Sequence, residues 1–174
     1  MISPVTVFTV QEGGASLLRK LLDTKSMCLS AVIAALYAAL CLLLAPISYG
    51  GVQCRLSEAM TLLPMVMPAA IPGLTVGCLL ANLLGGCSLW DILFGSLATL
   101  LAALGTYALR KRPLAAAACP VISNGVIVGC VLSKVYGLPM ALTIAQIALG
   151  EAAAVALGFG LMSALKRVDW SRFQ

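Results

Sequence analysis

The residues of this chain that could do chemistry are ionisable and amide side chains inside otherwise apolar stretches. They are Arg55, Glu58, Asn82, Asp91, Asn124 and Glu151. Such groups are costly within an apolar span, usually face a cavity or a partner, and are therefore candidates for a functional site. Carboxylates accept hydrogen bonds, a guanidinium donates them, and an amide does both. The set predicts a pocket that recognises a polar small molecule.

Each of these residues also has a purely structural interpretation. Arg55 and Glu58 are three residues apart and could pair on one helix face. Asp91 could only cap a helix, and the two asparagines could only bond neighbouring helices. Glu151 is hardest to explain in this way, because the stretch 135–165 holds no other charge.

Several classes of site are excluded by composition. The chain has no histidine, which rules out His-based triads and His metal sites. Its seven cysteines include no C-x-x-C pair, and most lie in apolar runs, which indicates packing residues. There is also no Gly-rich phosphate loop that ends in Gly-Lys-Ser/Thr. We therefore expect no metal, no cofactor and no use of ATP by this chain itself.

Apolar residues make up 61% of the 174 residues and charged residues only 10%. A soluble domain carries about 25% charged residues, so this composition indicates an all-α integral membrane protein. A spanning helix needs roughly 20 apolar residues. The uncharged stretches predict four such helices, at 27–46, 90–109, 114–133 and 139–165.

The stretch 56–86 is apolar but rich in proline and glycine. It predicts two short helices, 56–70 and 73–86, that break near Pro72-Gly73. Short interrupted segments of this kind often lie at the binding sites of transporters. The expected total is six membrane segments in one domain, 26–166, with cytoplasmic segments at 1–25 and 167–174.

The basic residues predict the orientation of these segments. With six spans, nine of the eleven basic residues fall on one side: Arg19, Lys20, Lys25, Arg110, Lys111, Arg112, Lys166, Arg167 and Arg172. The positive-inside rule makes this side cytoplasmic, together with both termini. The polar residues of the expected pocket then lie at mid-membrane or nearer the outside.

Small residues recur at spacing four, which allows close helix approach. One helix carries two such registers, Ala31-Ala35-Ala39 and Ala34-Ala38, and glycine pairs occur at Gly73/Gly77 and Gly125/Gly129. Most such pairs serve internal packing. The alanine registers could instead face a separate membrane subunit.

At these same residues the sequence resembles the QueT family, which comprises substrate-binding S components of energy-coupling factor (ECF) transporters. The likeness runs from about Met27 to Lys166. The matching segments are Val52–Pro64, Ile71–Leu74, Gly77–Asn82, Asp91–Thr99, Pro120–Gly129 and Gly150-Glu151.

The resemblance implies a six-helix S component that associates with a transmembrane coupling subunit and two cytoplasmic ATPases. It implies a queuosine precursor as substrate: a deazaguanine base, queuine or the nucleoside. It also implies docking on the coupling subunit through the alanines of the first helix, Ala31, Ala34, Ala35 and Ala38, without settling the register.

For such a ligand we expect Glu151 and Glu58 to accept hydrogen bonds from the base. Asn82, Asn124, Arg55 and Asp91 would lie in or beside the site, and Tyr49 or Trp90 could stack on the base. Trp90 could also be only an interfacial residue.

Two other functions stay open. One keeps the architecture but changes the ligand to another vitamin or nucleobase. The other is a self-sufficient, gradient-driven transporter in which Glu151 or Asp91 carries a proton. A membrane enzyme is disfavoured by the residues that the chain lacks.

Overall fold

The computed structural model describes residues 17–18, 21–49 and 55–165 of the chain, and most of these residues are helical, with no strand among them. The predicted cytoplasmic segments, 1–25 and 167–174, lie largely outside the described residues. The elements in chain order are α2 (Thr24–Leu43), α3 (Ala45–Ser48), η1 (Leu56–Met65), α4 (Ala70–Leu84), η2 (Asp91–Gly95), α5 (Ser96–Ala108), α6 (Pro113–Tyr136) and α7 (Met140–Leu165).

Four of the helices are long and apolar enough to cross a membrane: Thr24–Leu43, Asp91–Ala108, Pro113–Tyr136 and Met140–Ser163. They correspond to the four long helices expected from the charge gaps. The first is divided from α3 at Leu44, since Pro46 lacks the N–H that would continue the helix. α6 ends at Tyr136, and the Gly137 that follows it has a φ of 68°, which favours glycine.

The two short segments differ from their expected form. η1 is a 3-10 helix, and the break lies at 66–69, not at Pro72-Gly73. Pro72 falls in the first turn of α4, where its missing N–H has no intrahelical partner to lose. At about 2.0 Å per residue η1 spans about 20 Å, and at about 1.5 Å per residue α4 spans about 22 Å. Each is shorter than the ~30 Å hydrocarbon core.

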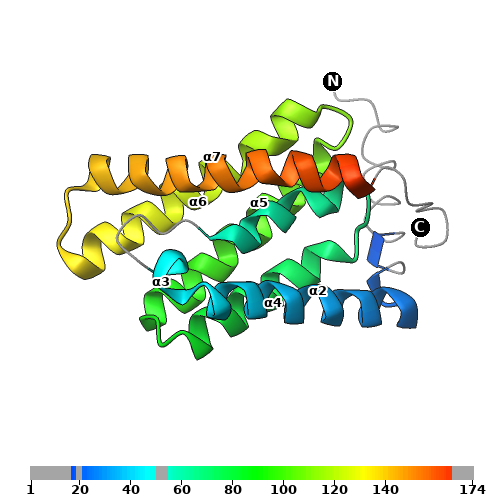
Figure 1. Cartoon of the computed structure of the whole chain (residues 1–174), viewed down its shortest axis with the longest axis horizontal. Helices are drawn as coiled ribbons and strands as arrows, with labels where there is room; N and C mark the ends of the chain where they lie inside the picture. Colours follow the sequence, from blue (N-terminus) through cyan, green and yellow to red (C-terminus); the bar gives the residue numbers. More distant parts are fainter. Residues whose placement is uncertain (1–16, 19–20, 50–54, 166–174) are drawn as a thin grey trace, which may run out of the picture.

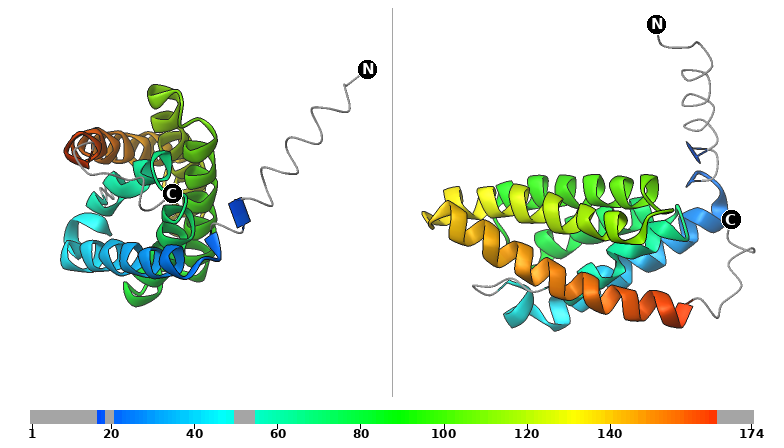
Figure 2. Two further views of the ribbon diagram at one scale, coloured as in Figure 1. Left: turned by 90° about the vertical axis from the view of Figure 1, so that its right-hand side faces the viewer. Right: turned by 90° about the horizontal axis from the view of Figure 1, so that it is seen from above.

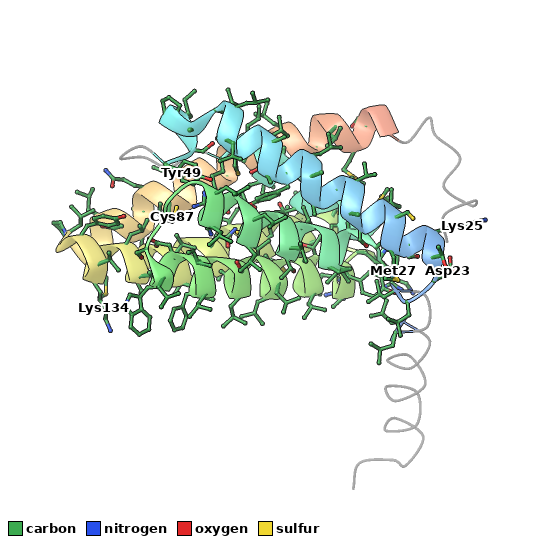
Figure 3. All side chains as sticks on the ribbon, turned by 90° about the horizontal axis from the view of Figure 1, so that it is seen from below. Asp23, Lys25, Met27, Tyr49, Cys87 and Lys134 are labelled. Carbon is green, nitrogen blue, oxygen red and sulfur yellow. The ribbon has the colours of Figure 1, made fainter. Side chains whose placement is uncertain are left out.

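The helices form one antiparallel bundle. The start of α2, the turn between α5 and α6 and the end of α7 lie at one end, and α3 and the turn from α6 to α7 lie at the other (Figure 1). Seen from above, α6 and α7 meet at that second end and diverge toward the first (Figure 2). The labelled side chains mark the two ends, with Lys25 at the first and Lys134 at the second (Figure 3).

Glycines set the closest helix contacts. A Cβ at Gly73 would lie 2.8 Å from the Ser30 carbonyl, and one at Gly77 would lie 2.8 Å from the Tyr37 Cβ, so α4 packs directly on α2. Gly129 likewise allows α6 to approach Ile144 of α7. η1 lies between α7, α5 and α2 and is buried along most of its length. This central position brings its charged residues into the bundle.

Candidate functional site

A small buried cavity lies where η1, the π-helical turn η2, α5, α6 and α7 meet. It measures ≈ 20 Å³, room for about one water molecule. The residues that line it are Arg55, Glu58, Gly95, Thr99, Asn124, Val128, Ile147 and Glu151. Four of the side chains singled out from the sequence therefore share one cavity.

The two carboxylates of the cavity are held in similar ways. The Tyr37 hydroxyl donates a hydrogen bond to Glu58 Oε1, and the Asn124 amide donates one to Glu151 Oε1. The second oxygen of each carboxylate is buried and has no partner within the protein. Across the described part of the chain, no side-chain nitrogen of Lys or Arg lies within 4.0 Å of a carboxylate oxygen. Glu58 and Arg55 are therefore not in ion-pair contact.

Arg55 sits at the start of η1 and contacts neutral groups. Its Nη1 donates to Cys78 Sγ at 3.8 Å, and its Cζ lies 5.5 Å from the centre of the Tyr49 ring. Arg55 Nε has no partner. Tyr49 does not line the cavity; its ring faces the guanidinium, and its hydroxyl donates to the Ala81 carbonyl at 2.6 Å.

The cavity gathers unsatisfied hydrogen-bonding atoms of both kinds. Its acceptors are Glu58 Oε2, Glu151 Oε2 and Asn124 Oδ1, and its donor is Arg55 Nε. The side chains that carry them are almost wholly buried, with exposed fractions of 3% for Glu58, 6% for Glu151, 3% for Asn124 and 9% for Arg55. Buried polar atoms in proteins are normally paired. The arrangement suits a polar molecule that offers several N–H donors and one acceptor.

Asn82, Asp91 and Trp90 do not line the cavity. Asn82 is fully buried, and its amide donates to the Asp91 carbonyl at 3.2 Å, which ties the end of α4 to η2. Asp91 Oδ2 accepts from the Ser88 hydroxyl at 2.7 Å, beside the helix start. Both side chains therefore make their hydrogen bonds outside the cavity.

Trp90 lies on the outer surface of the bundle. It is 58% exposed and stacks on Phe94 with ring centres 5.8 Å apart. Together with α6 residues from Val126 to Val135, these rings line a lateral groove that is separate from the cavity. This position suits an interfacial residue better than a stacking partner for a buried ligand.

Two residues of the site were missed by the sequence analysis. Tyr37 is fully buried on α2, the helix examined only for its alanines, and it supplies the hydrogen bond to Glu58. Thr99 lines the cavity from α5, with its hydroxyl donating to the Gly95 carbonyl at 3.0 Å. The signal for Tyr37 was its place in the same helical register as Ala34 and Cys41, which are both buried.

The two alanine registers of α2 differ in exposure. Ala34 and Ala38 are buried, and a Cβ at Gly77 of α4 would lie 3.0 Å from the Ala34 carbonyl. Ala31, Ala35 and Ala39 are exposed. In this arrangement only the register Ala31-Ala35-Ala39 is accessible to another subunit.

No group of three His, Cys, Asp or Glu side chains that could hold a metal ion occurs among the residues that the structure describes. The six described cysteines, Cys28, Cys41, Cys78, Cys87, Cys119 and Cys130, are free thiols. The polar cluster of the cavity is thus a set of hydrogen-bonding groups and charges.

Comparison with known proteins adds one match. Neither the search of curated proteins nor the search of solved structures found a similar protein. The family model described as QueT transporter matches residues 27–167, which is most of the chain and includes every residue that lines the cavity. The apolar helices, the buried polar cavity and this match agree, and the chain belongs to the QueT transporter family.

Proposed function

We propose that this protein is the substrate-binding membrane subunit of an ATP-driven ECF-type importer, and that it takes up a queuosine precursor without catalysing a reaction. The observation that carries the proposal is the buried cavity in which three acceptors and one donor have no partner within the protein. Membership of a transporter family supports transport as the purpose of that cavity.

A deazaguanine base fits this set of atoms. Its ring N–H and exocyclic amine can donate to Glu151 Oε2 and Asn124 Oδ1, and its carbonyl can accept from Arg55. The cavity of ≈ 20 Å³ is much smaller than a base, so the walls must separate when the ligand enters. We place that movement in η1, because long 3-10 segments are uncommon and often mark hinges.

The proposed membrane arrangement has six segments, with η1 and α4 as the two short ones. Arg110, Lys111 and Arg112 lie at the end of the bundle where α2 begins and α7 ends, and this end faces the cytoplasm by the positive-inside rule (Figure 1). Both termini are then cytoplasmic, and the ligand enters from the end marked by Lys134.

The partners in this proposal are a transmembrane coupling subunit and two cytoplasmic ATPases, since the chain has no phosphate loop of its own. The coupling subunit docks on the exposed register Ala31-Ala35-Ala39 of α2, where small side chains allow close helix approach. Ala34 and Ala38 serve internal packing instead.

A gradient-driven transporter is the second candidate, and one observation favours it. Glu58 and Glu151 are buried carboxylates, each with an oxygen that has no partner, and either could carry a proton. This candidate requires uptake by the chain alone in proteoliposomes under a proton gradient. The ECF proposal requires the ATPase module and ATP.

Titration of the purified protein with queuine, its aminomethyl precursor and its cyano precursor tests the ligand. We expect saturable binding of at least one of them. A vitamin that lacks a guanine-like ring serves as the control and should not bind. Recovery of a coupling subunit and ATPases with the protein from native membranes tests the class. Failure of every deazaguanine to bind would contradict the proposed substrate, and uptake without ATPases would contradict the ECF mechanism.

A further inference from the structure

We propose that the lateral groove between η2 and α6 binds one phospholipid with an anionic headgroup. The lipid phosphate pairs with Lys134, and an acyl chain lies along the outer face of α6. The groove shares no lining residue with the buried cavity. The lipid site is therefore additional to the proposed substrate site, and it concerns how the subunit is held in its bilayer.

The groove is large and almost wholly apolar. Its volume is ≈ 760 Å³, against ≈ 20 Å³ for the buried cavity. One side is a face of α6, on which lining residues recur at spacing four, as Val126, Cys130 and Lys134 do. The other side is formed by Trp90 and Phe94, whose rings stack with centres 5.8 Å apart. Of the described residues that line the groove, Lys134 alone is charged. Such a lining suits a hydrocarbon chain with a negative charge at one end.

The length of the groove matches the depth of one lipid leaflet. Its α6 residues run from Val126, near the middle of the helix, to Val135, next to its end. At about 1.5 Å per residue this stretch is about 14 Å long. One leaflet contributes half of the ~30 Å hydrocarbon core, or about 15 Å. An acyl chain in the groove would therefore reach from the headgroup level to the middle of the bilayer.

Lys134 stands at the end of the groove where a headgroup would lie. It is exposed in the last turn of α6, and its side chain points away from the bundle at that end (Figure 3). Among the residues that the structure describes, no carboxylate oxygen lies within 4.0 Å of its side-chain nitrogen. Basic groups at the ends of membrane helices attract anionic lipids. A lipid phosphate would supply the counter-charge that these residues do not.

The position of Lys134 is not explained by the proposed membrane orientation. Nine of the eleven basic residues fall on the cytoplasmic side of that arrangement. Of the other two, Arg55 is buried and Lys134 is exposed. Trp90 is 58% exposed in the same groove, as expected for an indole ring at the headgroup level. The groove thus combines a cation with an interfacial aromatic ring, and the proposed orientation puts the headgroup in the outer leaflet.

Quenching of Trp90 fluorescence by brominated lipids tests the site. The chain has two tryptophans, so Trp170→Phe leaves Trp90 as the only reporter. The full-length protein is reconstituted in phosphatidylcholine with increasing fractions of phosphatidylglycerol or phosphatidylcholine that is brominated on its acyl chains. The anionic lipid should reach half-maximal quenching at an about fivefold lower fraction than the neutral lipid, the preference expected for one basic side chain.

Three variants at exposed lysines assign the preference to the groove. Lys134→Gln should abolish it and leave quenching by the neutral lipid unchanged, because this change removes the charge and keeps the apolar lining. Lys134→Arg keeps the charge and should keep the preference. Lys111→Gln is the matched control, since Lys111 is exposed at the other end of the bundle and its loss should not alter quenching of Trp90.

Native mass spectrometry should also show one retained anionic lipid per protein, and none in Lys134→Gln. Equal quenching by the two brominated lipids, or a preference that survives in Lys134→Gln, would overturn the proposal. Absence of quenching by either lipid would overturn it as well, because protein, either a second copy of this chain or a partner subunit, would then cover the groove. None of these measurements uses a deazaguanine, so such results would leave the proposed function intact.

Discussion

The Tyr37 hydroxyl donates a hydrogen bond to the Glu58 carboxylate across the packed faces of α2 and η1. α2 also presents Ala31 and Ala35 on its exposed side. One helix therefore contacts the polar cavity with one face and the surroundings of the bundle with the other. Any shift of α2 would change the position of Glu58.

Replacing Tyr37 by Phe removes this hydrogen bond and keeps the ring. We expect ligand affinity to fall about tenfold or more, because a hydrogen bond to a charged group contributes about 1.5–3 kcal/mol. Calorimetric titration with a cationic deazaguanine measures the change. Tyr107→Phe is the matched control, since Tyr107 packs on Arg110 at the other end of the bundle. An equal loss of ligand affinity in both variants would contradict a role for the Tyr37–Glu58 hydrogen bond in ligand binding.

Enlarging the exposed alanine register should impair assembly alone. With Leu at positions 31 and 35, we expect loss of co-purification with the coupling subunit and unchanged ligand affinity, because the new side chains project away from the bundle. Ala34→Leu should instead lower the stability of the subunit itself. Ala34 is buried against Gly77, so overpacking should lower the free energy of unfolding by about 1–3 kcal/mol. Normal assembly of the Ala31/Ala35 variant would exclude this face as the docking surface.

The missing side chain at Gly158 of α7 allows η1 to pack closely against this helix. A Cβ at this residue would lie 2.6 Å from the Ala59 carbonyl, so Gly158→Ala must displace η1 and should destabilise the protein by about 1–3 kcal/mol. Gly160→Ala, two residues along, meets nothing within 4 Å and should stabilise α7 by up to about 1 kcal/mol. Thermal unfolding in detergent compares the two. Opposite shifts are expected, and equal shifts would contradict the packing argument.

The orientation can be tested with single cysteines in a protein whose own cysteines are replaced. Lys111→Cys should be protected from a membrane-impermeant maleimide in intact cells, and Lys134→Cys should be labelled. The two residues lie at opposite ends of the bundle. Labelling of position 111 from outside would reverse the proposed topology and the direction of ligand entry.

The long helices could be predicted closely from the sequence because charges and helix-ending residues bound them. α6 begins at Pro113, directly after Arg112, and ends before Gly137. The break between the short segments could not be placed, because Pro68 and Pro72 look alike in sequence. A proline in the first turn of a helix is tolerated, and the packing of α4 on α2 decides which proline lies there.

The site was predictable in part for a similar reason. Arg55, Glu58, Asn124 and Glu151 stand out because a charge or amide in an apolar run is conspicuous. Sequence spacing gives the depth of a residue in the bundle but not the direction in which it points. Asn82 and Asp91 were therefore expected in or beside the site. In the structure the Asn82 amide donates to the Asp91 carbonyl, and the Asp91 carboxylate accepts from Ser88. Tyr37 was overlooked because an aromatic residue among alanines suggests packing.

The 3-10 form of η1 limits how its length can change. With three residues per turn, Arg55, Glu58 and Thr61 stack in one row along the segment. An insertion or deletion of one residue between Arg55 and Glu58 would rotate one against the other by about 120° around the axis. Only an insertion of three residues would therefore keep the side chains of Arg55 and Glu58 in the same row.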